Sequence, residues 1–250
     1  MRPKALTCIT VVLLVLTAAS AYGACSGCSV SKSQYTEIAV TSPESLNPTV
    51  EVCAPSNPAS PTPVNLSVSA NDSDLCGDPY PISDSPLSYN WTGDVTGDGA
   101  SKTFYATYPG IFHTTCTVDD DGFCFNDSST GVNWTITVKG LTGLSNPGDV
   151  HRDASVVFTA SGTFGTTGTV SWSGLESSTS FSGPADSIAT TTYTTGGPQK
   201  VTATYCNTSF SVEFVVLVPC TSCCAHPDCS ETNPCCWYDP TVGNPCESAF

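Results

Sequence analysis

The stretch that most constrains the fold is residues 104–119, where a turn is followed by an alternating extended run. The turn is Tyr-Pro-Gly at 108–110, in which proline fixes its own φ and glycine accepts the positive φ that a turn often requires. After the turn, Phe112, Cys116 and Val118 fall on one face of an extended chain, and polar residues alternate with them. This pattern predicts a β-strand that buries one face.

Other runs in the chain share this short, extended and β-branched character. They are residues 50–53, 64–70, 89–92 and 133–138, and then residues 155–160, 170–174, 201–205 and 211–218. The second group repeats the order of the first after roughly 80 residues, a size that can fold alone. No helical periodicity interrupts them. The sequence therefore predicts an all-β protein of two tandem antiparallel sandwiches.

The first 23 residues have the form of a secretory signal peptide. Arg2 and Lys4 precede a short apolar run, and small residues lead up to Gly23. The apolar run is too short for a membrane span. We expect cleavage after Gly23, with cleavage after Ala21 as the alternative. A lipoprotein anchored at Cys25 is a further possibility. The predicted location is extracellular.

Cysteine content supports the same location. The chain has 15 cysteines, and one of them leaves with the signal peptide. The remaining fourteen are an even number on an exported chain, so we expect disulfides rather than free thiols. Lipidation of Cys25 would leave an odd number, which weighs against that alternative.

The net charge excludes one class of partner. The formal net charge is −15, and loss of the two basic residues of the leader lowers it to −17. A surface of this sign repels phosphate backbones, so we expect no nucleic-acid binding. Only 12% of the residues are charged, a composition that suits the solvated faces of β-sheets.

These features divide the chain into five parts. They are a signal peptide at 1–23, a cysteine-containing segment at 24–46, sandwich domains at 47–140 and 141–219, and a Cys-rich tail at 220–250. The glycines at 140–148 are the expected linker. The tail relies on covalent links in place of a core, and export favours disulfides over zinc there.

The first sandwich resembles the polycystic kidney disease (PKD) type of immunoglobulin-like module. The residues that carry the resemblance are Trp91, Gly97-Asp98-Gly99, Tyr108-Pro109-Gly110, Val118-Asp119 and residues 135–138. The second sandwich is similar through Trp172, Tyr193, Gly197 and residues 215–218, but it lacks Gly-Asp-Gly and Val-Asp. The resemblance implies seven-stranded sandwiches that serve as non-enzymatic spacer, adhesion or polysaccharide-contact modules. It also implies that both tryptophans are core residues.

In a sandwich of this type, the loops after the second and sixth strands lie at the same end. Cys76 and Cys124 are therefore candidate partners, which leaves Cys53 with Cys116, although four cysteines allow three pairings. The tail contributes an odd number of candidates, so at least one bridge must leave it, and Cys206 is a possible partner. The tail candidates are Cys220, Cys223, Cys224, Cys229, Cys235, Cys236 and Cys246.

Two acidic stretches contain oxygen ligands of the kind that calcium binds. Residues 94–99 supply oxygen ligands at only part of the positions that a calcium loop needs, so a turn is the better interpretation. Asp119, Asp120 and Asp121 form the densest acidic run, and a weak extracellular calcium site there is the one metal hypothesis. We expect no other cofactor.

No catalytic motif is present in the sequence. We therefore expect an exported, non-enzymatic structural or cell-adhesion protein that contacts protein or polysaccharide at the cell surface or in the matrix. The alternative is a carbohydrate-binding accessory module of a larger secreted enzyme.

Overall fold

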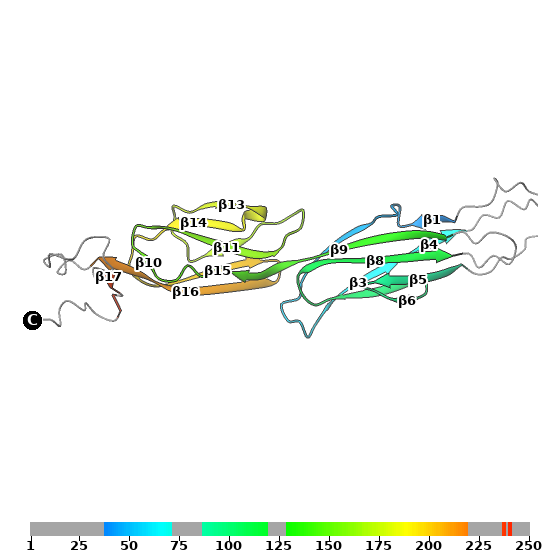
Figure 1. The fold of residues 1–250 in the computed structure, drawn as a ribbon, viewed down its shortest axis with the longest axis horizontal. Helices are drawn as coiled ribbons and strands as arrows, with labels where there is room; N and C mark the ends of the chain where they lie inside the picture. The colour runs from blue at the N-terminus through cyan, green and yellow to red at the C-terminus, as the bar shows by residue number, and fades with distance from the viewer. Residues whose placement is uncertain (1–37, 72–86, 120–128, 220–236, 239, 242–250) are drawn as a thin grey trace, which may run out of the picture. The chain divides into compact units, whose positions relative to one another are not determined.

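The computed structural model describes residues 38–71, 87–119, 129–219, 237–238 and 240–241 (Figure 1). Strands make up most of these residues, with one short 3-10 turn, η1 (Pro184–Asp186). The signal peptide, most of the N-terminal segment and most of the Cys-rich tail lie outside the described residues. The all-β prediction is confirmed.

Contacts between residues group the chain into two units. The first unit comprises Met1–Pro48, Leu66–Lys102 and Thr114–Asn133, and the second comprises Thr49–Asn65, Thr103–His113 and Trp134–Phe250. The domain boundaries expected from the sequence stay predictions.

One sheet contains the strand that follows the Tyr-Pro-Gly turn. Its members are β6 (Gly97–Asp98), β5 (Ser88–Gly93), β8 (Gly110–Asp119) and β9 (Ser129–Leu144), with β2 (Thr49–Cys53) beside β9. The pairing of β5 with β8 is antiparallel, whereas β2 runs parallel to β9. Two small pairs accompany this sheet: β1 (Ala39–Ser42) with β4 (Ser69–Asn71), and β3 (Thr62–Ser67) with β7 (Ser101–Ala106).

The C-terminal half contains two further layers, which Figure 1 shows in green to orange. One layer has the order β10 (Val150–His151), β16 (Thr208–Pro219), β15 (Gly197–Tyr205) and β12 (Ser171–Ser173), and β17 (Trp237–Tyr238) pairs antiparallel with the end of β16. The other has the order β13 (Ser180–Ser182), β14 (Ile188–Thr192) and β11 (Ser155–Thr163), followed by the end of β9.

This strand order is that of an immunoglobulin-like sandwich. In that fold, strands A, B, E and D form one sheet and strands C, F and G the other. In the C-terminal half, β9, β11, β14 and β13 occupy the A-B-E-D positions, and β12, β15 and β16 occupy C-F-G. In the N-terminal half, β5, β8 and β9 occupy C-F-G. The predicted immunoglobulin-like fold class is confirmed.

Alternation along the strands places the core. In β8 and β9 the inward residues, among them Cys116, Val118, Ile136 and Val138, are fully buried. Burial of this apolar face is the main favourable term for a half-exposed strand. Trp91 is also buried in the core, as expected. Trp172 is only partly buried, although it packs against the core clusters of the C-terminal half.

The linker expected at 140–148 is in part a strand. β9 continues through Gly140 to Leu144, and this end pairs with β11 through Leu144↔Ala160 and Leu141↔Gly162. The prediction of a linker there was wrong for residues 140–144. Gly162 explains how the strands approach so closely, because a Cβ at this position would overlap the backbone of Gly140 and Leu141.

Candidate functional site

Four residues of the predicted sites lie in the described part of the chain: Cys53, Cys116, Cys206 and Asp119. Cys76 and Cys124, the seven tail cysteines, Asp120 and Asp121 lie outside it. The Cys76–Cys124 pairing and the bridges of the tail therefore stay predictions. Asp119 ends β8, where its carbonyl accepts a hydrogen bond from Ser88.

A calcium site at the acidic run also stays a prediction. Within the described residues, no three His, Cys, Asp or Glu side chains gather closely enough to hold a metal ion. The turn at 97–99 has a structural contact: the carbonyl of Gly99 accepts a 2.7 Å hydrogen bond from the Trp91 indole. Gly97 and Gly99 both have φ above 100° there, a conformation that glycine adopts at little cost.

Cys53 is disulfide-bonded to Cys206. The two Cα atoms are 5.5 Å apart, and the residues are separated by 153 positions in the sequence. Cys53 ends β2, and Cys206 lies in the turn between β15 and β16. The predicted pairing of Cys53 with Cys116 was wrong, and so was the suggestion that Cys206 pairs with the tail.

Strand order explains why Cys53 cannot reach Cys116. β9 lies between β2 and β8, so the two cysteines are on strands two positions apart. Two strand spacings are about 9.5 Å, whereas the Cα atoms of a disulfide lie within about 7 Å. Cys116 is instead a free thiol on the inner face, opposite Trp91. Burial raises the pKa of Cys116 to about 11, so the thiol stays neutral.

Beside the disulfide is an ion pair that the sequence did not reveal. Lys139 Nζ lies 3.3 Å from Glu51 Oε2, and their side chains are only 14% and 26% exposed. The amide of Thr166 donates a 2.9 Å hydrogen bond to Glu51 Oε1. The carboxylate therefore links β2, β9 and the segment after β11. No motif in the sequence marks these three residues, because they are far apart along the chain.

The Glu51 site predicts a pH dependence of stability. The amide of Thr166, with a smaller contribution from Lys139, holds the pKa of Glu51 below its usual value of 4.5. A lowered pKa means that the ionised form stabilises the folded state above this value, and that the contribution is lost as the pH falls through the lowered pKa. We expect Glu51→Gln to lower the melting temperature at about pH 7, and to do so by less at an acidic pH below the lowered pKa.

The exposed pair Lys200–Glu213 offers the control for this experiment. Its nitrogen and oxygen are 3.0 Å apart, but the side chains are 60% and 75% exposed. Exposed pairs of this kind contribute little. Glu213→Gln should therefore leave the melting temperature nearly unchanged at both pH values. A Glu51→Gln effect that is equal at the two pH values would contradict the assigned role of the Glu51 charge.

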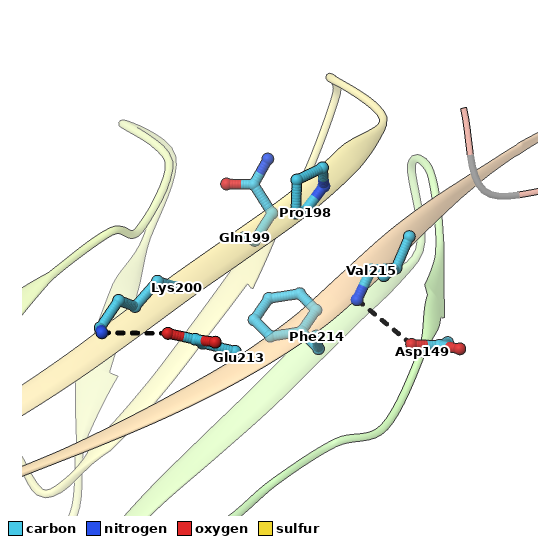
Figure 2. A pocket seen from close by; sticks show the side chains of 7 residues that line it. All are labelled: Asp149, Pro198, Gln199, Lys200, Glu213, Phe214 and Val215. Atoms are coloured by element: carbon cyan, nitrogen blue, oxygen red, sulfur yellow. Dashed lines mark hydrogen bonds and ion pairs between the residues drawn. The ribbon is translucent and has the colours of Figure 1, made fainter. Parts of the chain in front are cut away.

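A solvent-open pocket of about 510 Å³ lies on the C-terminal half (Figure 2). Its lining residues come from β15, β16 and the residue before β10: Pro198, Gln199, Lys200, Glu213, Phe214, Val215 and Asp149. Figure 2 shows Asp149 Oδ1 accepting a 3.2 Å hydrogen bond from the Val215 amide. This bond fixes one carboxylate at the end of the pocket away from the exposed Lys200–Glu213 pair.

The chemistry of the pocket suits polar contacts. It combines two carboxylates, one ammonium and one side-chain amide with the apolar surfaces of proline and valine. Such a set can form hydrogen bonds with a hydroxylated ligand. No sequence motif marks this pocket, because Asp149 is brought to β16 by the parallel pairing of β10 with β16.

Comparisons with known proteins identify no family. No family model matches the chain, and no curated protein matches it. The chain is similar to the solved structure of an I-band fragment of titin, I67–I69, at 14% identity and a TM-score of 0.39, over 74% of this chain and 66% of that chain.

Two further solved structures have similar scores. Immunoglobulin domains 1–4 of Sidekick-1 match at 12% identity and a TM-score of 0.37, over 75% of this chain and 50% of that chain. The D00–D0 domain of intimin matches at 13% identity and a TM-score of 0.37, over 72% of this chain and 98% of that chain. The chain spans less than two thirds of the titin and Sidekick-1 chains. These similarities are distant, and the fold assignment rests on the strand order.

The described part of the chain contains no helix with the length and apolar character needed to cross a bilayer.

Proposed function

We propose that the protein is an exported, non-enzymatic structural or adhesive protein that acts at the cell surface or in the extracellular matrix. Its two immunoglobulin-like sandwiches are of the PKD type, and they contact protein or polysaccharide. The Cys-rich tail is a disulfide-bonded part of the same exported chain.

The observation that carries the proposal is the Cys53–Cys206 disulfide. Disulfides form and persist in oxidising compartments, and they are rare in the cytosol. This bridge joins residues 153 positions apart, so it fixes the tertiary structure rather than a local loop. A covalent link of this kind suits a protein that must keep its shape outside the cell.

The outer sheet faces support a structural role. On β15 and β16, Thr202 Oγ1 lies 2.8 Å from Ser211 Oγ, and Thr204 Oγ1 lies 3.0 Å from Ser209 Oγ. Cross-strand hydroxyl pairs stabilise a sheet modestly while keeping its face polar. A polar face with few charges can remain solvated without attracting nucleic acid.

The second candidate is carbohydrate binding, which the pocket of Figure 2 favours. Carboxylate, amide and ammonium groups beside the proline ring offer donors and acceptors to sugar hydroxyls. In this case, the pocket is the site of contact with polysaccharide.

The test begins with export. The full chain is expressed in a secreting host, and protein from the medium is mapped by peptide analysis without reduction. We expect a linked pair of peptides containing Cys53 and Cys206. The purified protein is then applied to a glycan array and to immobilised matrix proteins. Retention inside the cell, or turnover of a substrate by the purified protein, would contradict the proposal.

A variant of the pocket separates the two candidates. Lys200→Ala combined with Glu213→Ala removes two exposed groups of the pocket without opening the core. Loss of glycan binding in this variant would assign the carbohydrate function. Protein binding that survives the substitution would support the adhesive function.

A further inference from the structure

β9 pairs with a different strand along each part of its length. Its residues Thr135–Lys139 pair with β2 in parallel, and the residues from Gly140 to Leu144 pair with β11. One continuous strand thus takes the G position of one sandwich and the A position of the next. β2, this end of β9 and the β15–β16 turn all belong to the second of the two units.

The end of β2 is attached to the β15–β16 turn by more than the disulfide. Asn207 Nδ2 donates a 3.2 Å hydrogen bond to the carbonyl of Ala54. The amide of Ala54 in turn donates to the carbonyl of Lys139 at 2.8 Å. On the other side of the turn, the Leu141 amide donates a 2.6 Å hydrogen bond to Thr208 Oγ1.

Two glycines allow these segments to approach closely. A Cβ on Gly140 would lie 2.9 Å from Pro109 Cγ and 3.0 Å from Thr208 Cγ2. A Cβ on Gly165 would lie 2.6 Å from Glu51 Oε2 and would overlap the Lys139 side chain. The contacts are therefore direct, and there is no room for a side chain between the segments.

We infer that these residues form a junction clamp that makes β2 open together with the β15–β16 sheet. The clamp comprises Glu51, Cys53, Ala54, Lys139, Thr166, Cys206 and Asn207. Among the described strands, β2 is paired only with β9, and an edge strand of this kind opens at low free energy unless it is fixed elsewhere. The clamp fixes β2 at both sides, through Glu51 to Thr166 and through Cys53 and Ala54 to the turn.

The inference goes beyond the proposed function, because it concerns local opening and no ligand. The links to Thr166, Cys206 and Asn207 join the β2 segment to residues more than 100 positions away in the chain. A crosslink over so long a loop restricts the open state strongly. Opening of β2 alone is then suppressed, and its amides exchange only when the β15–β16 sheet also opens.

Hydrogen exchange measured by mass spectrometry on the oxidised full chain tests this coupling. In the unsubstituted protein, we expect peptides covering β2 and peptides covering Val201–Ala203 in β15 to exchange with similar protection. The variant Cys53→Ala/Cys206→Ala should lose at least about tenfold in the protection of β2, while the β15 peptides keep theirs. Retained protection in β15 also shows that the variant is folded.

Asn207→Ala leaves the disulfide in place and supplies a milder second variant. It should weaken β2 protection by a smaller factor, and Lys200→Gln in the exposed pair should change neither peptide. The inference is overturned if β2 protection is unchanged in the cysteine variant. It is equally overturned if β2 and β15 lose protection together, because the coupling would then survive without the clamp. Neither result depends on whether the protein is exported or adhesive.

Discussion

Replacement of Trp91 with alanine should lower the free energy of unfolding by about 3–5 kcal/mol, which is typical of a large aromatic removed from a core. The side chain is only 1% exposed, and its indole donates a 2.7 Å hydrogen bond to the Gly99 carbonyl. The substitution therefore opens a cavity and leaves the turn carbonyl without its donor. Denaturant unfolding of the oxidised protein measures the loss.

Trp172→Ala is the matched control for this substitution. Trp172 occupies the equivalent position in the C-terminal half, but it is only partly buried, and its indole donates to the exposed carbonyl of Asp186 at 2.9 Å. Less apolar surface is lost, so the effect should be clearly smaller. Equal losses for the two variants would contradict the assignment of Trp91 as the central core residue of its sandwich.

Strands were predictable because burial of one face produces a local alternation of apolar and polar residues. The alternation after the Tyr-Pro-Gly turn predicted β8, and the structure buries Cys116 and Val118 on the expected face. Phe112 on that face is only half-buried, because it lies near the beginning of the strand. The run at 50–53 was likewise expected to be extended, and it forms most of β2.

Contacts between distant segments were not predictable from local pattern. The pairing of Cys53 depends on β9 lying between β2 and β8, which no property of the cysteines themselves encodes. The strand character of residues 140–144 was missed because glycine is typical of linkers. In the structure, Gly140 serves close packing against Pro109 and Thr208.

The candidate sites also depend on contacts between segments that are distant in the sequence. Glu51, Lys139 and Thr166 come from three separate segments, and the sequence contains no spacing that relates them. The pocket likewise depends on the register of β15 with β16, which places Lys200 opposite Glu213. Neither site could be derived before the strand order was known.

The tyrosines of the two turns show how one motif position can have two environments. Tyr108 and Tyr193 match the same position of the motif in the two sandwiches. In the structure, however, Tyr193 is 1% exposed and Tyr108 is 61% exposed. The rings of Tyr193 and Phe214 pack edge to face, with their centroids 5.3 Å apart. The Tyr193 hydroxyl donates a 3.0 Å hydrogen bond to the Gly174 carbonyl. Burial, and secondarily the Glu176 carboxylate, raises the pKa of Tyr193 to about 12, so the hydroxyl remains a donor at neutral pH.

Tyr193→Ala should therefore cost about 3–5 kcal/mol of unfolding free energy, as expected for a buried aromatic. Tyr193→Phe keeps the ring and removes only the hydroxyl, so we expect a loss of about 0.5–1.5 kcal/mol, the usual net value of one hydrogen bond. Tyr108→Ala should cost no more than about 0.5–1.5 kcal/mol, because the side chain is largely exposed and its ring packs edge to face with Phe112, with the ring centroids 5.5 Å apart. Thermal and denaturant unfolding of the three variants would rank them. A Tyr108→Ala loss as large as that of Tyr193→Ala would mean that the first turn, and not only the second, is part of the core.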